Sequence, residues 1–203
     1  TVSQDQHAPT AMVFSDGVWY DPADRLFKMW YMGGYVKSTC YATSQDGIHW
    51  DKPLLDVVPG TNVVHTGYRD SGTVWLELGE PDPARRFKMA LREDGGVLTL
   101  YFSGDGIHWG EPVGRTGPLR DRSTFFFNPF RKVWVFSAKG YEGGGLGRYR
   151  HYHEGADLVS AGAWEEGQPV FWVGADTLDP PREDLKTPCE LYNLDCVAYE
   201  SLI

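Results

Sequence analysis

The sequence predicts an all-β fold made of β-propeller blades, each a sheet of four antiparallel strands, and three observations support this prediction. The same short motifs return in the same order with a period of about 60 residues. Short apolar and aromatic runs alternate with turns rich in Gly, Pro and Asp. No stretch shows a sustained apolar period of the kind that helices require. Short antiparallel strands repeated in this way are typical of propellers.

The repeat is carried by three markers that occur twice in the same order. They are Asp-Gly-Ile-His-Trp at 46–50 and 105–109, Phe-Lys-Met at 27–29 and 87–89, and Asp-Pro at 21–22 and 82–83. A weaker third copy lies at 124–137, and residues 197–199 resemble the first strand of a fourth. The predicted units span about residues 12–66, 67–118, 119–175 and, in part, 188–203.

The first two strands of a unit follow from local composition. Residues 17–20 are a short apolar and aromatic run, which predicts the first strand. The turn at 21–24 suits Pro, which fixes φ, and Asp, whose carboxylate accepts hydrogen bonds from nearby amides. Residues 26–32 predict the second strand, which ends at Gly33 and Gly34.

The last two strands of the unit are predicted in the same way. Residues 38–43 predict the third strand, and 44–47 predict a second turn. Residues 48–50 predict a short fourth strand at the sheet edge, because Pro53 follows and proline is confined to edges. A propeller needs about four to eight blades to close. We therefore expect the chain to be a fragment, with the remaining blades outside it.

Composition and charge exclude several classes of function. The formal net charge is −9, which disfavours binding to the phosphate backbone of nucleic acids. No apolar stretch predicts a membrane span and no signal peptide is recognised, so the compartment is left open. The three cysteines, Cys40, Cys189 and Cys196, are an odd set that does not describe a disulfide framework.

No metal or other cofactor is predicted. His151 and His153 alternate along the chain, but two histidines alone make a weak metal site. The glycine-rich run at 143–147 lacks the Lys-Ser or Lys-Thr of a phosphate-binding loop. It is expected to be a surface loop near the channel.

A carboxylate precedes the first strand of every predicted unit. These residues are Asp16, Asp70, Asp121 and Glu190. The first strand has the richest aromatic run and suits the inner position of a blade, so its start lies near the central channel. Glycoside hydrolysis requires two carboxylates on either side of the scissile bond. The set therefore has the chemistry that glycoside hydrolysis requires.

The repeated elements resemble a known family. Ser-x-Asp-Gly-x-x-Trp at 44–50 and 103–109 is similar to a hairpin turn of the five-bladed β-fructosidase superfamily. That superfamily includes the invertase-like and arabinanase-like enzymes of glycoside hydrolase families 32 and 43. Asp-Pro followed by Phe-Lys-Met is similar to another of its hairpins. The resemblance covers about residues 12–139 and implies a five-bladed propeller that hydrolyses fructosides or arabinosides.

The resemblance also implies roles for single residues. Arg69-Asp70-Ser71 resembles the Arg-Asp-Pro motif of the family, whose Asp binds sugar hydroxyls and stabilises the transition state; here Ser replaces Pro. It implies that Arg69 also binds substrate. Glu190 is the candidate general acid, although the family has Cys after the Glu and here Cys189 precedes it.

Two further assignments complete the predicted site. Asp16 is the candidate nucleophile or base, and Asp121 with Arg122 is a candidate substrate clamp. Purely structural alternatives stay open: a Ser-Asp-Gly turn at Asp16 and an Arg–Asp turn pair at Asp70. If the first blade lies outside the chain, the true nucleophile lies outside it too.

The carboxylates in the repeated turns are interpreted differently. Asp21, Asp46 and Asp105 recur from unit to unit, which favours a role in hairpin turns over a unique catalytic role. The predicted geometry places Asp16, Asp70 and Asp121 at one end of a shared channel and the turn residues Asp46 and Asp105 on the outer rim.

Two other classes of function are carried as alternatives. One is a non-catalytic propeller that binds carbohydrate, because aromatic residues beside carboxylates serve binding as well as catalysis. The other is a protein-binding scaffold, which an acidic surface permits. The sequence does not choose the sugar, nor between retention and inversion.

Overall fold

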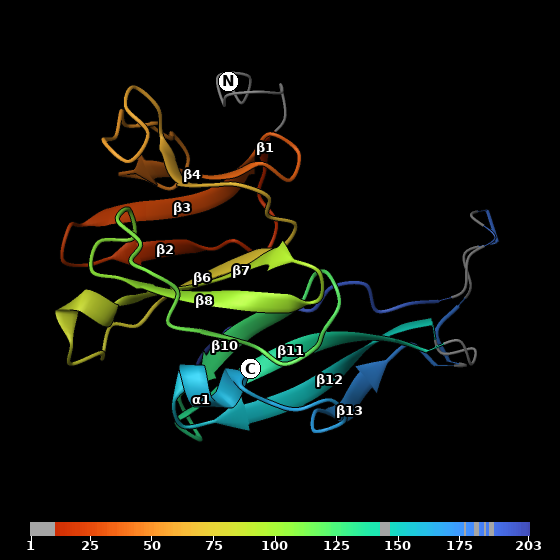
Figure 1. Cartoon of the computed structure of the whole chain (residues 1–203). Coiled ribbons are helices and arrows are strands. Elements are labelled where there is room, and N and C mark those ends of the chain that lie inside the picture. The colour runs from red at the N-terminus through yellow and green to blue at the C-terminus, as the bar shows by residue number, and fades with distance from the viewer. Residues whose placement is uncertain (1–10, 143–146, 177, 181–182, 185, 187–188) are drawn as a thin grey trace. The chain divides into compact units, whose positions relative to one another are not determined.

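Figure 1 shows the computed structural model, which describes residues 11–142, 147–176, 178–180, 183–184, 186 and 189–203. The described chain is nearly all β-structure, in three antiparallel sheets, as the sequence predicts. None of the helices in these residues is long and apolar enough to cross a membrane.

The strands follow the chain in order from sheet to sheet. The first sheet contains β1 (Ala11–Met12), β2 (Val18–Asp21), β3 (Leu26–Gly33), β4 (Ser38–Ser44) and β5 (Val63–Thr66). The second contains β6 (Gly72–Leu76), β7 (Phe87–Asp94), β8 (Val97–Ser103) and β9 (Gly114–Arg115). The third contains β10 (Thr124–Asn128), β11 (Val133–Glu142), β12 (Gly147–Gly155) and β13 (Val170–Gly174). A 3₁₀ turn (Pro83–Arg85) precedes β7, and helix α1 (Leu158–Gly162) follows β12.

The chain forms two compact units. The first comprises Thr1–Gly95 and Thr99–Val113, and the second comprises Gly96–Leu98 and Gly114–Ile203. The first unit therefore holds β1 to β7 and most of β8, and the second holds β9 to β13 with α1.

The first strand of the first sheet is split in two. Both β1 and β2 pair with β3, at residues 32–33 and 26–29 respectively. Because β4 occupies the other edge of β3, β1 and β2 share one edge. Residues 13–17 interrupt this edge, and Asp16 lies in the interruption.

Strands β2 and β6 lie side by side within the first unit. The Trp19 indole donates to the Val74 carbonyl at 2.7 Å, and its ring centroid is 4.5 Å from that of Trp75. The backbone amide of Val74 donates to the Asp16 carbonyl at 2.7 Å. First strands of successive sheets are adjacent in this way when they take the inner position of neighbouring blades.

The Asp-Pro marker is a hairpin turn in all three sheets. Asp21 accepts a hydrogen bond from the Ala23 amide, and Asp82 accepts one from the Ala84 amide. Asn128, in the third sheet, does the same for the amide of Phe130. Side-chain oxygens that bond the backbone two residues on stabilise such turns, and the predicted turn role is confirmed.

The Asp-Gly-Ile-His-Trp marker is a second turn, built identically in both copies. Asp46 Oδ1 accepts from the amides of Ile48 and His49, each at 2.8 Å, and Asp46 Oδ2 lies 2.7 Å from His49 Nδ1. Asp105 makes the same contacts with Ile107 and His108. Both aspartates follow third strands, two strands away from β2 and β6.

The predicted fourth strand at 48–50 is wrong. Asp46 takes the amides of residues 48 and 49 into its turn, so these amides are not available to a neighbouring strand. The fourth strands are instead β5 and β9, which come later in the chain. The predicted strand at 197–199 is also absent, and Tyr199 forms only an isolated bridge with Leu202 in this part of the described chain.

The Asp-Gly-Ile-His-Trp turn of the second sheet also contacts the first sheet. The fully buried Trp30 donates from its indole to the Gly106 carbonyl at 2.7 Å, and its ring lies 5.5 Å from that of Phe87. Burial of such large aromatic rings dominates the energetics of a β core. The repeated turn therefore has a packing role within the first unit.

The turn of the second sheet should respond to pH. Hydrogen bonds that the His108 ring donates to Asp105 and Asp56 raise the pKa of His108 above its ordinary value. Burial alone would raise the pKa of Asp105, but its hydrogen bonds with the His108 ring and nearby amides outweigh this and lower it to about 2.

The stabilisation from His108 is therefore present below about pH 6.5 and is lost as the pH rises through the raised pKa. We expect the Tm of the protein to fall by more between pH 6 and pH 9 than the Tm of His108→Gln does. The matched control is His49→Gln: Asp46 raises the pKa of His49 as well, but this side chain is 87% exposed, so His49→Gln should flatten the pH slope less than His108→Gln does. Equal pH slopes for wild type and His108→Gln would contradict this prediction.

Candidate functional site

In the first unit, the candidate nucleophile Asp16 is buried in an ion pair. Its side chain is 1% exposed, and its Oδ1 accepts a hydrogen bond from Arg69, which is 0% exposed. The interrupted strand before Gly17 brings Asp16 to the start of β6, where Arg69 lies. The two charges compensate each other in an environment where either alone would be costly.

Asp70, which follows Arg69, is the more accessible of the two predicted carboxylates. Its side chain is 16% exposed, and Oδ2 lies 3.3 Å from Nη1 of Arg92. The Asp70 amide donates to the Arg92 carbonyl at 3.0 Å, which holds the start of β6 against β7. The structure therefore brings Asp16, Arg69 and Asp70 together at one strand start.

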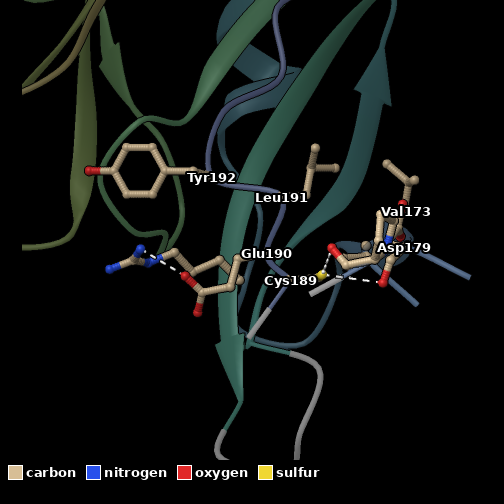
Figure 2. A pocket seen from close by; sticks show the side chains of 10 residues that line it. Val173, Asp179, Cys189, Glu190, Leu191 and Tyr192 are labelled. Atoms are coloured by element: carbon tan, nitrogen blue, oxygen red, sulfur yellow. Dashed lines mark hydrogen bonds and ion pairs between the residues drawn. The ribbon is translucent and has the colours of Figure 1, made fainter. Parts of the chain in front are cut away.

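The second unit contains a pocket of about 750 Å³, and Glu190 is one of the residues that line it (Figure 2). Figure 2 shows the Glu190 carboxylate, whose Oε2 lies 2.9 Å from Nη1 of Arg148. The pocket is lined by Arg148, Val173, Gly174, Ala175, Asp179, Pro180, Cys189, Glu190, Leu191 and Tyr192. A cavity of this volume is in the range of small-ligand sites.

Tyr192 connects the pocket to the second predicted carboxylate of this unit. The Tyr192 hydroxyl donates to Asp121 Oδ2 at 3.2 Å. Two cations lie near the Tyr192 ring: Lys139 Nζ is 4.2 Å and the Arg148 guanidinium 4.7 Å from its centroid. Asp121 and Glu190 therefore lie in one network around the Tyr192 side chain.

Lys139 is the ionic partner of Asp121. Its Nζ lies 2.5 Å from Asp121 Oδ1, and its side chain is nearly fully buried on β11. Burial lowers the pKa of Lys139, and the hydrogen bond to Asp121 opposes this effect. Desolvation disfavours the charged amine, whereas the carboxylate favours it. The predicted clamp residue Arg122 contributes its backbone carbonyl, which accepts from Arg150 at 2.7 Å.

Three members of this network were missed by sequence reasoning as site residues: Lys139, Arg148 and Tyr192. A signal was present for Lys139, which interrupts a strand that is largely apolar or aromatic. A charged residue inside a buried strand requires a charged or polar partner. The sequence does not show which partner, because the segments around Asp121 and Glu190 lie far apart in the chain.

Within the described residues, no three His, Cys, Asp or Glu side chains gather as metal ligands. The cysteines Cys40, Cys189 and Cys196 are free thiols. His151 and His153 both lie on β12. In the glycine-rich run at 143–147, residues 143–146 lie outside the described residues.

Comparison with known proteins shows the class of fold. No protein-family model and no curated protein matches the sequence. Among solved structures, the catalytic domain of the Coprinopsis cinerea GH62 α-L-arabinofuranosidase matches with a TM-score of 0.51 and 16% sequence identity. The match covers 76% of this chain and 51% of that chain, so this chain spans about half that length. At this identity the likeness shows the fold alone, an all-β, propeller-like fold that a glycosidase domain also has.

Proposed function

We propose that the protein hydrolyses the glycosidic bond of an arabinoside- or fructoside-like carbohydrate, as enzymes of the β-fructosidase superfamily do. The observation that carries the proposal is the position of Glu190. This predicted catalytic carboxylate lines a pocket of about 750 Å³, in a chain whose fold resembles that of an arabinofuranosidase domain.

In the proposed reaction, Glu190 donates a proton to the leaving oxygen of the sugar as the glycosidic bond breaks. A water molecule adds to the anomeric carbon, and the proton that it releases returns Glu190 to its acid form. Its partner Arg148 is 40% exposed, so a sugar entering the pocket displaces the guanidinium from the carboxyl group at little steric cost. Asp121 and the Tyr192 hydroxyl bind sugar hydroxyls beside the reacting bond. The first unit carries a separate candidate group, in which Asp70 is proposed to bind sugar, with Arg69 and Asp16 beside it at the start of β6.

Glu190→Gln is expected to reduce the rate of hydrolysis about 10²–10⁴-fold, the usual contribution of a general acid. The amide has nearly the shape of the carboxyl group but has no acidic proton to donate. The assay measures kcat and KM on 4-nitrophenyl α-L-arabinofuranoside, arabino-oligosaccharides and sucrose.

The matched control for Glu190→Gln is Asp179→Asn, because Asp179 lines the same pocket and has no proposed catalytic role. It should keep kcat within about threefold of wild type, a loss small beside that of a missing general acid. If Glu190→Gln hydrolyses its substrate as fast as Asp179→Asn, Glu190 is not the general acid.

A non-catalytic sugar-binding function has one specific observation in its favour. Each of the four candidate carboxylates is ion-paired with a basic side chain, and the pairs are Asp16–Arg69, Asp70–Arg92, Asp121–Lys139 and Glu190–Arg148. Paired carboxylates suit binding of hydroxyl groups as well as catalysis. Calorimetric binding of the same sugars by a protein that forms no product would support this alternative.

A further inference from the structure

A fully buried arginine joins the two chain segments that carry Asp121 and Glu190. Arg150 lies on β12 and is 0% exposed. Its Nη1 donates to the Arg122 carbonyl at 2.7 Å, one residue after Asp121. Its Nη2 donates to the Tyr192 carbonyl at 2.5 Å, two residues after Glu190. One rigid guanidinium thus holds both segments.

Only arginine has the shape for this contact. Its planar guanidinium presents donors in a fixed fork, so two acceptors held by it keep a set separation. A lysine ammonium is a single point on a flexible stem and reaches the two carbonyls less well. Neither of the two acceptors is a carboxylate, so the contact organises backbone and leaves the side chains of Asp121 and Glu190 to their own partners.

Burying the Arg150 charge costs free energy, which indicates that the arginine is present to hold its two acceptors in place. Burial lowers the pKa of Arg150 to about 10, and the Asp195 and Asp121 charges oppose this. The group therefore stays charged at neutral pH in a buried site, where an apolar side chain would often be at least as stabilising. Arg150 is paired in register with Lys139 of β11, so Arg150 and the lysine that binds Asp121 lie opposite each other on neighbouring strands.

We propose that Arg150 is a positioning residue that sets the separation of Asp121 and Glu190. The inference rests on the proposed function, because it concerns the distance between the two carboxylates across a bound sugar. Misplacing a reacting group by about 1 Å costs on the order of 10²-fold in rate.

The test compares Arg150→Lys with Thr124→Val. Thr124 lies three residues after Asp121 and joins the same two segments, but through a single hydrogen bond, from its hydroxyl to the Leu194 carbonyl at 2.8 Å. Arg150→Lys is expected to lower kcat about 100-fold while KM changes less than about threefold, and Thr124→Val to leave kcat near the wild-type value. Arg150→Met is a second variant that removes the fork entirely.

A second measurement does not depend on catalysis. Cys189 precedes Glu190, and its thiol donates to the carbonyls of Asp179 and Pro180. Loosening of this segment in Arg150→Lys should speed the reaction of Cys189 with a thiol reagent, followed by mass spectrometry. Cys40 is 0% exposed in the first unit and should stay unreactive, which shows that the first unit of the variant is folded.

The outcomes separate this inference from the proposed function. Wild-type kcat in Arg150→Lys, or equal losses in Arg150→Lys and Thr124→Val, would overturn the positioning role. If the wild type itself hydrolyses no sugar, the proposed function fails. The inference is then decided by thiol labelling. An unchanged labelling rate of Cys189 in both Arg150 variants overturns it, and faster labelling of Cys189 with Cys40 still protected supports the positioning role of Arg150.

Discussion

Asp16→Asn is expected to destabilise the protein by about 3–5 kcal/mol, the usual cost of removing one partner of a buried ion pair. Asp16 is 1% exposed and Arg69 is 0% exposed, so the substitution leaves the Arg69 charge buried without its counter-charge. Gly72 packs against this pair so closely that a side chain there would collide with Arg69, and little room exists for water to compensate. Urea denaturation at pH 7 measures the loss as a fall in the free energy of unfolding.

Asp70→Asn is the matched control, because Asp70 is next to Arg69 in the chain but lies in a partly exposed pair with Arg92. It should lower stability by no more than about 1 kcal/mol, as partly exposed ion pairs contribute little. If Asp70 binds sugar as proposed, the same variant loses sugar binding while remaining folded. A stable Asp16→Asn protein that has lost only activity would instead make Asp16 the catalytic group.

Gly106→Ala should destabilise the protein by about 2–4 kcal/mol, combining overpacking with left-handed backbone strain. The backbone φ of Gly106 is +79°, a conformation that side chains rarely adopt. An added Cβ would lie 2.5 Å from Cζ2 of Trp30 and 3.2 Å from the Phe87 ring. Trp30 is fully buried and donates to the Gly106 carbonyl, so it has no room to retreat.

The chain offers a matched control in the first copy of the same turn. Gly47 has φ of +75°, but its added Cβ would meet nothing closer than the Phe27 ring at 3.8 Å. Gly47→Ala should therefore cost only the backbone strain, about 1–2 kcal/mol. The difference between the two variants in urea denaturation isolates the packing contribution. Equal losses of unfolding free energy in Gly106→Ala and Gly47→Ala would show that a side chain at position 106 does not disturb Trp30.

Local features of the candidate site were predictable from the sequence. Asp70 stands out because it precedes a first strand, and neither Asp70 nor Glu190 recurs in the turns. The partners Arg92, Lys139 and Arg148 could not be assigned, because the pairing joins positions 22, 18 and 42 residues apart through folding. Buried lysine and arginine side chains signal that partners exist but not which they are.

The sequence by itself determined the repeat, the turns and the sheets. Asp21, Asp82, Asp46 and Asp105 bond amides two or three residues away, so their turns are local and readable from composition. The tertiary structure alone decided the location of the fourth strands and the burial of Asp16. The amides of 48 and 49 are taken by Asp46, which moves the fourth strand to β5, and the split first strand buries Asp16 against Arg69. Both outcomes depend on which distant segments of the chain come into contact in the fold. A local pattern of residues does not contain this information.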